Sequence, residues 1–548
     1  MTFDVSRLTF DASRTIVLTG FMGTGKTVVG RAVAEALGRP FVDMDAVLEE
    51  RLGTTIADYF RTAGEPAFRR AEAGLVRELS ARRGLVVATG GGALVDEGNR
   101  RAFLESGAAV ILLECALSQI LRRLDGANDR PLLAGDDPTG AAARLLADRR
   151  AAYEAIPLRL DTTHLTVAEA AERVLRLAAA ASAAPLQMLA LPAGAGGYDV
   201  VLAEGLLARS GPLLRAAGLG PRTAVVSEPQ VRALHGAALQ QALEKAGSEA
   251  TWLEAPAGEA AKTYESLHRL YDGFLAAGVD RYTTVVALGG GALSDAAGFA
   301  AATWMRGVPW ITIPTTLLAQ VDAGIGGKVA IDHPGGKNLI GAFHPPRLVL
   351  LDPVLLRTLP EADLRSGLAE VVKHGVISAP ALFEHLEAQG VEPLARTVSE
   401  AVRVKVDVVA EDPEERGRRA VLNLGHTVGH AIERVMGFGL RHGEAVSMGM
   451  VVVTRLAVRL GICDPALEPR LTALLAGLGL PVHPPEIDPE AVWQAMSADK
   501  KRRGGEVRFV LPVRLGEVLV RGGSRREEVL SAWRETSSVT PPARSLRR

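Results

Sequence analysis

Histidines gather in one short part of this chain. His426, His430 and His442 are three of only 11 histidines among 548 residues, and a glutamate, Glu444, follows closely. Imidazole is the commonest metal ligand and exchanges protons near neutral pH. Two histidines four residues apart also occur on solvated helix faces, but a third one nearby favours a reaction centre. On the residues alone, all three rings are assigned jointly to one metal ion.

A second candidate site is a glycine-rich turn near the N-terminus. Gly20-Phe-Met-Gly-Thr-Gly-Lys-Thr27 follows a strand-like run and precedes a helical pattern, which is the context of a phosphate-binding loop. Backbone amides of such a turn surround phosphate at a helix N-terminus. Lys26 would neutralise the phosphates of ATP, and the Thr27 hydroxyl would bind Mg²⁺. The residues predicted to bind ATP here are Gly23, Thr24, Gly25, Lys26 and Thr27.

Polar groups follow this loop in an order that suits a phosphoryl acceptor. Asp43 and Asp45 come after the next short strand, and Arg69 lies in a later helical run. Gly90–Gly92 follows another strand, and Arg130 precedes a proline. Taken singly, these features could be a helix cap, a solvated ion pair, a turn and a loop. Together they indicate a site for a small acceptor beside the phosphates.

The second half of the chain has another glycine turn and many cations. Gly289-Gly-Gly-Ala-Leu-Ser-Asp295 follows an apolar strand, so it is a candidate dinucleotide loop, although it lacks the GxGxxG spacing. Downstream, lysine, arginine and asparagine interleave with glycine and apolar residues, which a solvated surface explains poorly. This pattern favours a phosphorylated, polyhydroxylated, acidic substrate. The groups lie at 320–322, 326–328, 336–338, 370–373, 405, 414–415 and 418–423.

These candidate residues need elements that position them. Apolar, β-branched runs alternate with helical segments, which predicts βαβ units and parallel sheets. The runs cover 15–19, 85–88, 109–113, 200–201, 223–226 and 284–288. From about residue 355 the pattern becomes mostly helical and contains the histidines.

An Ala/Ser/Pro stretch, Ala178–Pro185, interrupts the alternation and predicts a domain junction. The predicted fold class is α/β: a phosphate-loop domain with a parallel sheet, then an α/β dinucleotide-binding domain, then a mostly helical domain for metal and substrate. The predicted bounds are 1–178, a linker at 179–185, 186–354, 355–535 and a disordered basic tail at 536–548.

Composition excludes several classes of protein. A formal net charge of -1 supplies no bulk attraction to nucleic acid or to a membrane. Only two cysteines occur, Cys115 and Cys463, so a disulfide framework is excluded and a reducing cytoplasm is expected. The N-terminus lacks a secretory pattern, and no long apolar run predicts a transmembrane helix.

The first half resembles shikimate kinase across residues 14–175, on the phosphate loop, the two aspartates, the arginine pair after Phe68, the three glycines and the Asp-Arg-Pro-Leu-Leu segment. This resemblance implies ATP-dependent phosphorylation of shikimate. Asp45 would hold the acceptor hydroxyls and favour their attack, and Asp43 would help position Mg²⁺. Arg130 would lie on a lid over the nucleotide.

The same resemblance implies how the acceptor is held. Arg69 and Arg149 would bind its carboxylate, for which a planar guanidinium is well suited, and Gly91 would allow close backbone approach. Arg149 is preferred to Arg150 because the family arginine lies four residues before a tyrosine, here Tyr153. The catalytic residues implied for this half are Lys26, Asp45 and Arg130.

The second half resembles 3-dehydroquinate synthase over roughly residues 186–535. The glycine loop, the GGK and GKN turns, AEVVKHG, NLGHTVGHA and HGEAV all occur in family order. The resemblance implies a metal set different from the three histidines: Glu370, His426 and His442 would bind Zn²⁺, with Co²⁺ as the alternative, while His430 would transfer protons. One carboxylate and two imidazoles leave positions open for substrate.

The implied reaction uses NAD catalytically. It cyclises 3-deoxy-D-arabino-heptulosonate 7-phosphate to 3-dehydroquinate and releases phosphate. The implied NAD contacts are Glu259, Lys262, Gly291, Ala292, Leu293, Ser294, Asp295, Thr315, Thr316, Lys328, Lys337, Leu355, Leu356, Arg357 and Thr358. The implied substrate contacts are Arg306, Asp322, Lys328, Asn338, Lys373, Lys405, Arg419, Asn423, His430 and Lys500, with Lys501 the alternative to Lys500. The implied catalytic residues are His430, Glu415 and Lys373.

One departure from the family pattern concerns the NAD site. The family's DGExxK turn appears as Ala257-Gly-Glu259-Ala-Ala-Lys262, with alanine in place of the first acid. Glu259 and Lys262 remain, so NAD is still expected to bind, and only the role of the first position is in question.

Both resemblances fall in the route to chorismate, so a bifunctional enzyme is predicted, with homodimerisation through the second half. The two steps are not consecutive, and direct transfer of product between the halves is not expected. The alternatives are another small-molecule phosphate-loop kinase, such as a gluconate or nucleotide kinase, and another sugar-phosphate cyclase or a glycerol-phosphate dehydrogenase. A third is one half kept as an inactive scaffold, which the presence of Lys26, Thr27, Asp43 and Asp45 disfavours.

Overall fold

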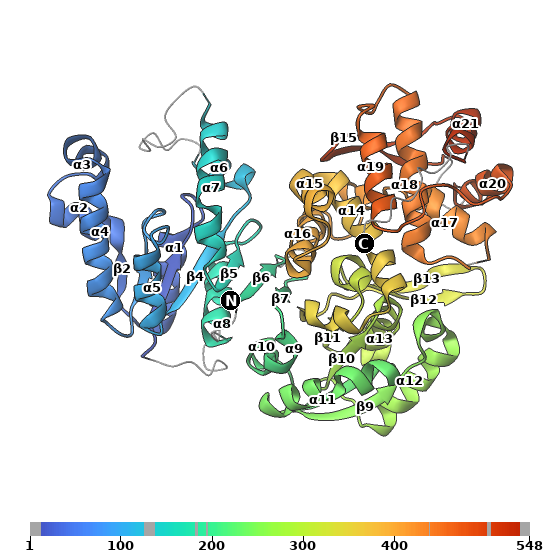
Figure 1. The fold of residues 1–548 in the computed structure, drawn as a ribbon. Coiled ribbons are helices and arrows are strands. Elements are labelled where there is room, and N and C mark those ends of the chain that lie inside the picture. The colour runs from blue at the N-terminus through green and yellow to red at the C-terminus, as the bar shows by residue number, and fades with distance from the viewer. Residues whose placement is uncertain are drawn as a thin grey trace.

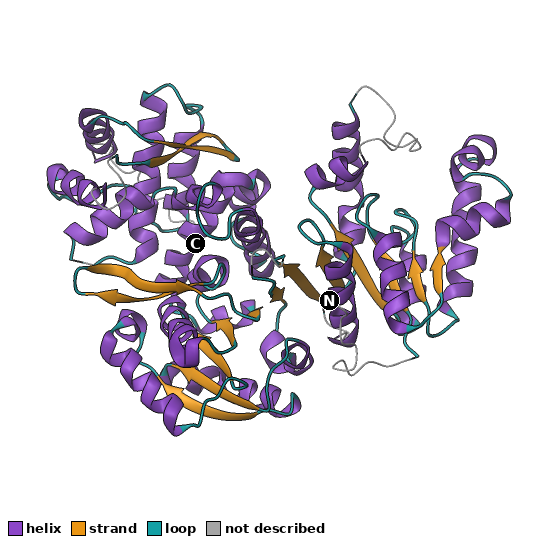
Figure 2. Cartoon of the chain, turned by 180° about the vertical axis from the view of Figure 1, so that it is seen from behind, coloured by secondary structure: helices purple, strands orange, loops and turns teal. Residues whose placement is uncertain are grey.

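Twelve strands form one continuous sheet through both halves of the chain (Figure 1). The computed structural model describes residues 13–124, 137–180, 185–192, 196–437, 439–500 and 506–537. The strand order is β2-β3-β1-β4-β5-β6-β7-β14-β11-β10-β8-β9. Helices flank the strands on both sides in each half (Figure 2).

The first five strands are parallel and carry the phosphate loop. β1 shows why the layers form: Ile16 and Leu18 pack with α1 and α8, whereas Val17 packs with α4 and α5 on the other face, as the two-residue period of a strand requires. The elements are β1 Ile16–Thr19, α1 Lys26–Leu37, β2 Phe41–Asp43, α2 Met44–Leu52, α3 Ile56–Ala63, α4 Glu65–Ser80, β3 Val86–Ala88, α5 Glu97–Glu105, β4 Ala109–Glu114, α6 Leu117–Leu124, α7 Pro138–Glu154, β5 Leu158–Asp161 and α8 Val167–Ala180.

Two strands join the halves. β6 (Leu186–Ala190) pairs in parallel with β5, and β7 (Asp199–Leu202) pairs antiparallel with β6. The strands that follow β7 in the order of the sheet, which are β14, β11, β10, β8 and β9, all run parallel to it. Strand direction therefore reverses at β6–β7, and the carboxyl ends of the two parallel sets leave the sheet at opposite edges. Ligands bind at the carboxyl ends of such strands, so each half has an edge of its own for a site.

The second parallel set is covered by helices and followed by a hairpin of β12 and β13. Its elements are α9 Leu206–Arg209, α10 Gly211–Ala216, β8 Arg222–Ser227, α11 Pro229–Lys245, β9 Glu249–Glu254, η4 Gly258–Lys262, α12 Tyr264–Ala276, β10 Thr284–Gly289, α13 Gly291–Thr303, η5 Trp304–Arg306, β11 Trp310–Pro314, η6 Ala319–Ala323, β12 Lys328–His333, β13 Gly336–Phe343, β14 Leu348–Leu351 and η7 Pro353–Thr358.

The remainder is mostly helical, as predicted, and it has one large apolar core that includes Val372, Phe383 and Met450. It also contains an antiparallel hairpin of β15 and β16, which the sequence analysis did not predict. The elements are α14 Glu361–Ser378, α15 Pro380–Gln389, α16 Leu394–Glu411, η8 Arg418–Asn423, α17 His426–Val435, α18 His442–Arg459, α19 Leu467–Gly477, α20 Pro489–Lys500, β15 Phe509–Arg514, β16 Glu517–Arg521 and α21 Arg526–Ser537.

Helix α16 lies against the first half of the chain (Figure 1). Arg403 pairs with Glu114 and Asp161 at the ends of β4 and β5, and Asp407 pairs with His164 at 3.0 Å. Another residue of the same helix, Lys405, pairs with Asp322 in the second half. One helix thus contacts both parts of the molecule.

The structure confirms the predicted α/β class and the six predicted strands. Two boundary expectations are corrected. Ala179 and Ala180, assigned to the linker, belong to α8, and Thr536 and Ser537, assigned to the tail, belong to α21, where Thr536 is buried. The rest of the tail lies outside the described residues. Among the described residues, no helix has the length and apolarity needed to cross a membrane.

Candidate active sites

The phosphate loop links β1 to α1. Gly20 has φ 140°, and a Cβ there would lie 2.3 Å from the Leu113 carbonyl oxygen, so only glycine fits. Gly25 caps α1 in the left-handed region with φ 98°, and the helix begins at Lys26. The Lys26 Nζ donates to the Phe21 carbonyl oxygen at 2.9 Å, which holds the ammonium over the turn. Amides at a helix N-terminus and a lysine beside them form an anion site.

The residues predicted to hold Mg²⁺ meet beside this loop. The Thr27 hydroxyl donates to Asp43 Oδ2 at 2.8 Å. The other oxygen, Asp43 Oδ1, accepts from the Asp45 amide at 3.1 Å and so caps α2. A hydroxyl and a carboxylate at a phosphate loop are the oxygen ligands that Mg²⁺ prefers.

The three glycines after β3 bring the predicted acceptor-binding side chains together. A Cβ at Gly90 would lie 2.6 Å from Asp45 Oδ1, and one at Gly92 would lie 2.8 Å from an Arg69 nitrogen. A Cβ at Gly91 would lie 3.4 Å from Arg149 Nη1. The glycine turn therefore leaves just enough room for one carboxylate and two guanidinium groups around a small acceptor.

Two further residues support this pocket, and sequence reasoning assigned neither of them to it. Glu72, one turn after Arg69 on α4, is buried and pairs with it at 2.7 Å. Burial raises the pKa of the Glu72 carboxyl, with Asp45 adding to the rise, although Arg69 opposes it. The Tyr153 hydroxyl donates to the Gly91 carbonyl oxygen at 2.8 Å and thus holds the glycine turn. The i, i+3 spacing of Arg69 and Glu72 was the sequence signal that could have identified this ion pair.

The histidines lie beside a glutamate from a distant helix. Glu370 on α14 is fully buried, and its Oε1 lies 3.6 Å from Nε2 of both His426 and His442. These distances are too long for hydrogen bonds. Metal–ligand bonds of about 2.1 Å at tetrahedral angles put ligand atoms roughly 3.4 Å apart. Oε1 is also buried without a hydrogen-bond partner, so the three groups fit a zinc ion.

The other ring nitrogens of these two histidines are already engaged. His426 Nδ1 donates to the Leu424 carbonyl oxygen at 3.1 Å, and His442 Nδ1 lies 3.5 Å from Glu433 Oε1. Such partners orient a ligating imidazole, and here both leave Nε2 directed at Glu370. Glu433 was not predicted from the sequence. Burial lowers the pKa of His442, but Glu370 and Glu433 outweigh it and raise that pKa to about 9.

Two other ligand sets overlap this one. His426, His430 and His442 present ligand atoms within 4.8 Å of one another, and so do Asp322, Glu370 and His374. Lys373 pairs with Glu370 Oε2 and with Asp322, so both carboxylates of the second set are engaged by a cation, whereas Glu370 Oε1, which faces the histidines, has no hydrogen-bond partner. The three-histidine set expected from the residues alone remains geometrically possible.

Cations surround the centre as the family pattern implies. Asp322 lies in the π-turn η6, a helix form often found at functional sites, and pairs with Lys373 at 3.1 Å and with Lys405. Burial lowers the pKa of Lys405 to about 8, although Asp322 opposes that change. Arg419 is also buried, and its guanidinium donates to the Gly326 and Pro413 carbonyl oxygens.

A second group of predicted residues extends from this cluster. Lys328 pairs with Glu415, whose other oxygen accepts from Asn423 at 3.2 Å.

Three of the four described non-glycine residues with positive φ are predicted site residues: Arg306, Asn338 and Glu415. Backbone conformations of this kind cost energy and occur preferentially at functional sites.

The predicted dinucleotide loop lies at the carboxyl ends of β10 and β11. The Thr315 amide donates to the Gly289 carbonyl oxygen at 2.9 Å, which brings the two turns together. Lys262 pairs with Asp295 at 2.7 Å and also donates to Asn338. Burial raises the pKa of Asp295 to about 6, although Lys262 opposes the rise.

Known proteins are similar to each half. The shikimate kinase family model matches residues 22–179, and the N-terminal and C-terminal models of 3-dehydroquinate synthase match residues 252–366 and 367–502. A 3-dehydroquinate synthase from a Synechococcus strain is 46% identical over 345 residues, which are 61% of this chain and 93% of that protein.

The chain belongs to the 3-dehydroquinate synthase family. It is a fused enzyme of the shikimate pathway, with a shikimate kinase phosphotransferase activity and a 3-dehydroquinate synthase lyase activity.

Two solved structures of other synthases share the fold of the second half. A 2-epi-5-epi-valiolone synthase from Streptomyces hygroscopicus, with NAD⁺ and Zn²⁺ bound, is 32% identical with a TM-score of 0.58, covering 62% of this chain and 96% of its own. A 2-deoxy-scyllo-inosose synthase, with NAD⁺ and Co²⁺ bound, is 25% identical with a TM-score of 0.56, covering 62% and 97%. Both are less identical to this chain than the Synechococcus 3-dehydroquinate synthase is.

Several predicted residues lie apart from the two clusters or outside the part of the chain that the structure describes. Arg306 is exposed. Leu355 and Leu356 are buried in the core, and Arg357 lies 3.9 Å from Glu204. Arg130 lies outside the described residues, as does the side chain of Lys500.

Proposed function

We propose that the two clusters carry the two activities separately. The kinase site lies within residues 1–178, and the synthase site lies between the NAD-binding part, 186–354, and the helical part, 355–535. The reversal of strand direction at β6–β7 supports this assignment, because it directs the two sets of carboxyl ends to opposite edges. We propose no direct transfer of product between them.

In the kinase site, Lys26 and the amides of the loop bind the phosphates of ATP, and Thr27 with Asp43 holds Mg²⁺. Arg69 and Arg149 bind the shikimate carboxylate. Asp45 then accepts a hydrogen bond from the reacting hydroxyl and orients it for attack. The convergence of these groups on Gly90–Gly92 supports the assignment. Arg130 stays a prediction from the sequence.

In the synthase site, Glu370, His426 and His442 hold Zn²⁺ or Co²⁺. The metals named in the two neighbouring synthase structures support this choice. Zn²⁺ held by these residues would supply a Lewis acid for a substrate oxygen, and bound NAD would supply reversible hydride transfer.

The chain's own residues bind and orient the substrate at this centre. Lys373, Lys405 and Arg419 direct N–H groups at its anionic ends, and loss of one such donor typically costs about 3–4 kcal/mol of transition-state stabilisation. His430 transfers a proton through its imidazole, and Glu415, held by Lys328 and Asn423, assists.

NAD binds along the turn after β10, against Thr315 and Thr316. Two residues of η4 lie beside this proposed NAD site. Lys262 pairs with Asp295, and Glu259 pairs with Lys337 at 3.4 Å. We further propose a homodimer through the synthase half, in which the exposed Arg306 reaches substrate of the partner copy. The two free cysteines support a reducing cytoplasm as the compartment.

The equal 3.6 Å distances from Glu370 Oε1 to both histidines carry the metal assignment. The test compares the metal content of Glu370→Gln and His430→Gln, measured by elemental analysis of the purified protein. We expect Glu370→Gln to lose the metal ion and His430→Gln to keep it while losing turnover. Metal retained in Glu370→Gln and lost in His430→Gln would instead establish the three-histidine set.

A further inference from the structure

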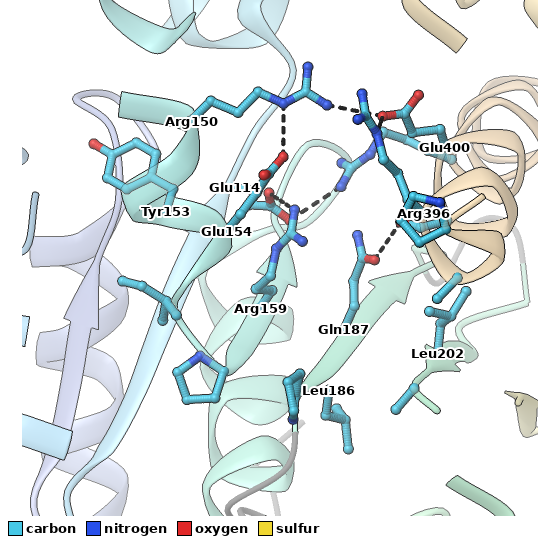
Figure 3. A pocket seen from close by; sticks show the side chains of 18 of the residues that line it. Glu114, Arg150, Tyr153, Glu154, Arg159, Leu186, Gln187, Leu202, Arg396 and Glu400 are labelled. Carbon is cyan, nitrogen blue, oxygen red and sulfur yellow. Dashed lines mark hydrogen bonds and ion pairs between the residues drawn. The ribbon is translucent and has the colours of Figure 1, made fainter. Parts of the chain in front are cut away.

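A cavity of about 770 Å³ lies between the two halves (Figure 3), and Tyr153, whose hydroxyl holds the glycine turn of the kinase site, is among its lining residues. The sheet forms its floor. Helix α7 forms one wall, through Leu146 and Arg150, and helix α16 forms the other, through Arg396 and Ser399. The cavity thus has one wall from each enzyme, in the size range of small-molecule sites.

The floor places three side chains in one row. The sheet register pairs Arg159 with Gln187 across β5–β6, and Gln187 with Leu202 across β6–β7. Paired residues on neighbouring strands point to the same face, about 4.8 Å apart. All three line the cavity.

Two buried donors in this row have no hydrogen-bond partner. Gln187 is only 5% exposed, and its Oε1 accepts from the Ser399 hydroxyl at 2.6 Å, but its Nε2 is unpaired. Arg159 Nη2 pairs with Glu114 at 2.6 Å, whereas its Nε is buried and unpaired. Unpaired buried polar groups are rare, and each calls for an explanation. Figure 3 shows the Gln187 nitrogen directed away from the floor.

The half-buried carboxylates of Glu114 and Glu400 are already neutralised. Glu114 pairs with Arg159 and Arg403, and Glu400 pairs with Arg150 at 3.0 Å and with Arg396 at 2.9 Å. The lining holds four arginines, 150, 159, 396 and 403, and four glutamates, 114, 154, 204 and 400. The charges of the lining therefore balance, and the groups that still lack a partner are the N–H donors of Gln187 and Arg159.

We propose that this cavity binds a small organic carboxylate with an apolar body. Its two oxygens accept from Gln187 Nε2 and Arg159 Nε, and its body packs on Leu146 and Leu202. A carboxylate fits because its two oxygens can each meet one donor of the row. A single charge fits better than a dianion because the arginines are already paired.

The cavity exists only because the two enzymes share one chain. The α7 wall falls in the kinase match and the α16 wall falls in the synthase match, whereas Gln187 lies in the segment between the matches. Neither family alone supplies this site. The assignment also uses no residue of either active site, so it stands or fails apart from the proposed function.

The test uses benzoate as the probe and benzamide as its uncharged counterpart, titrated calorimetrically into the full chain. Saturating shikimate is present to keep the probe out of the kinase acceptor site. We expect saturable benzoate binding that weakens about tenfold or more in Gln187→Leu. The control Gln241→Leu, at an exposed position on α11, should bind benzoate like the parent.

A second variant, Gln187→Glu, keeps the size of the side chain and sets a carboxylate against the probe. It should also weaken benzoate binding, and thermal unfolding of both variants checks that they fold. Benzoate binding unchanged in both folded variants would overturn the proposal. So would benzamide binding as tight as benzoate binding, inorganic phosphate competing as well as benzoate, or no saturable binding to the parent chain.

Discussion

The two proposed active sites of this molecule are built in different ways. The kinase site is made largely of backbone turns at strand ends, and its Lys26 and Asp45 are only half-buried. The synthase centre is made of side chains from α14, α16, α17 and α18, and its Glu370 and Lys373 are 0% exposed. On the proposed assignment, the kinase site binds charge through backbone amides, whereas the synthase site binds it through buried ion pairs.

This difference predicts different sensitivities. Loss of one side chain from a backbone turn should leave the stability of the protein nearly unchanged, because the backbone of the turn remains. In a buried ion network, removal of one charge leaves its partner without compensation, which is more costly than the pair itself is stabilising. The predictions below test this contrast and the independence of the two sites.

The largest expected effect comes from the pair Lys26→Ala and His426→Ala. Each should lower one activity about 100- to 1,000-fold and leave the other nearly unchanged, because no described contact joins the two clusters directly. Both activities are assayed on each purified variant. Loss of both activities in either variant would show that the sites are coupled.

Arg403→Met tests the junction between the halves. It removes the cation shared by Glu114 and Asp161 and should reduce the free energy of unfolding by roughly 2 kcal/mol. That is less than the 3–5 kcal/mol or so of a fully buried pair, because the Arg403 side chain stays 31% exposed. Thermal unfolding measures the change. The control is Arg150→Met, whose pairs with Glu154 and Glu400 are more exposed and should contribute under about 1 kcal/mol.

Glu72→Gln tests the positioning of Arg69. The neutral side chain should loosen the guanidinium and raise the KM for shikimate about tenfold, with the KM for ATP unchanged. Steady-state kinetics measure both constants. Glu65→Gln is the matched control, because Glu65 pairs with the same arginine at 3.1 Å but is exposed. Equal effects of the two substitutions would contradict a special role for the buried carboxylate.

The smallest effect concerns the charge of Lys405. Its pKa of about 8 means that the ammonium is present below that pH and is lost as the pH rises through it. The KM for the heptulosonate phosphate should therefore rise severalfold within one pH unit above this value. Lys405→Arg, which stays charged, should flatten that rise. An unchanged profile in Lys405→Arg would assign the titration to another group.

Much of the kinase site was predictable because it is local in the sequence. The turn from Gly20 to Thr27 and the glycines after β3 are contiguous, and their spacing alone specifies the backbone that surrounds a phosphate or an acceptor. The register question between Arg149 and Arg150 was not local. In the structure, Arg149 lies at the glycine turn, whereas Arg150 pairs with Glu400 of the other half.

The sequence by itself determined the α/β alternation, the phosphate loop and the clustering of histidines, because each depends on residues within one or two turns of chain. Only the tertiary structure decided that Glu370 meets His426 and His442, that Glu433 orients one of them, and that β6 joins two sheets into one. Glu370 lies on a different helix from the histidines, and the distances between these groups follow from how helices and strands pack, which local residue patterns do not encode.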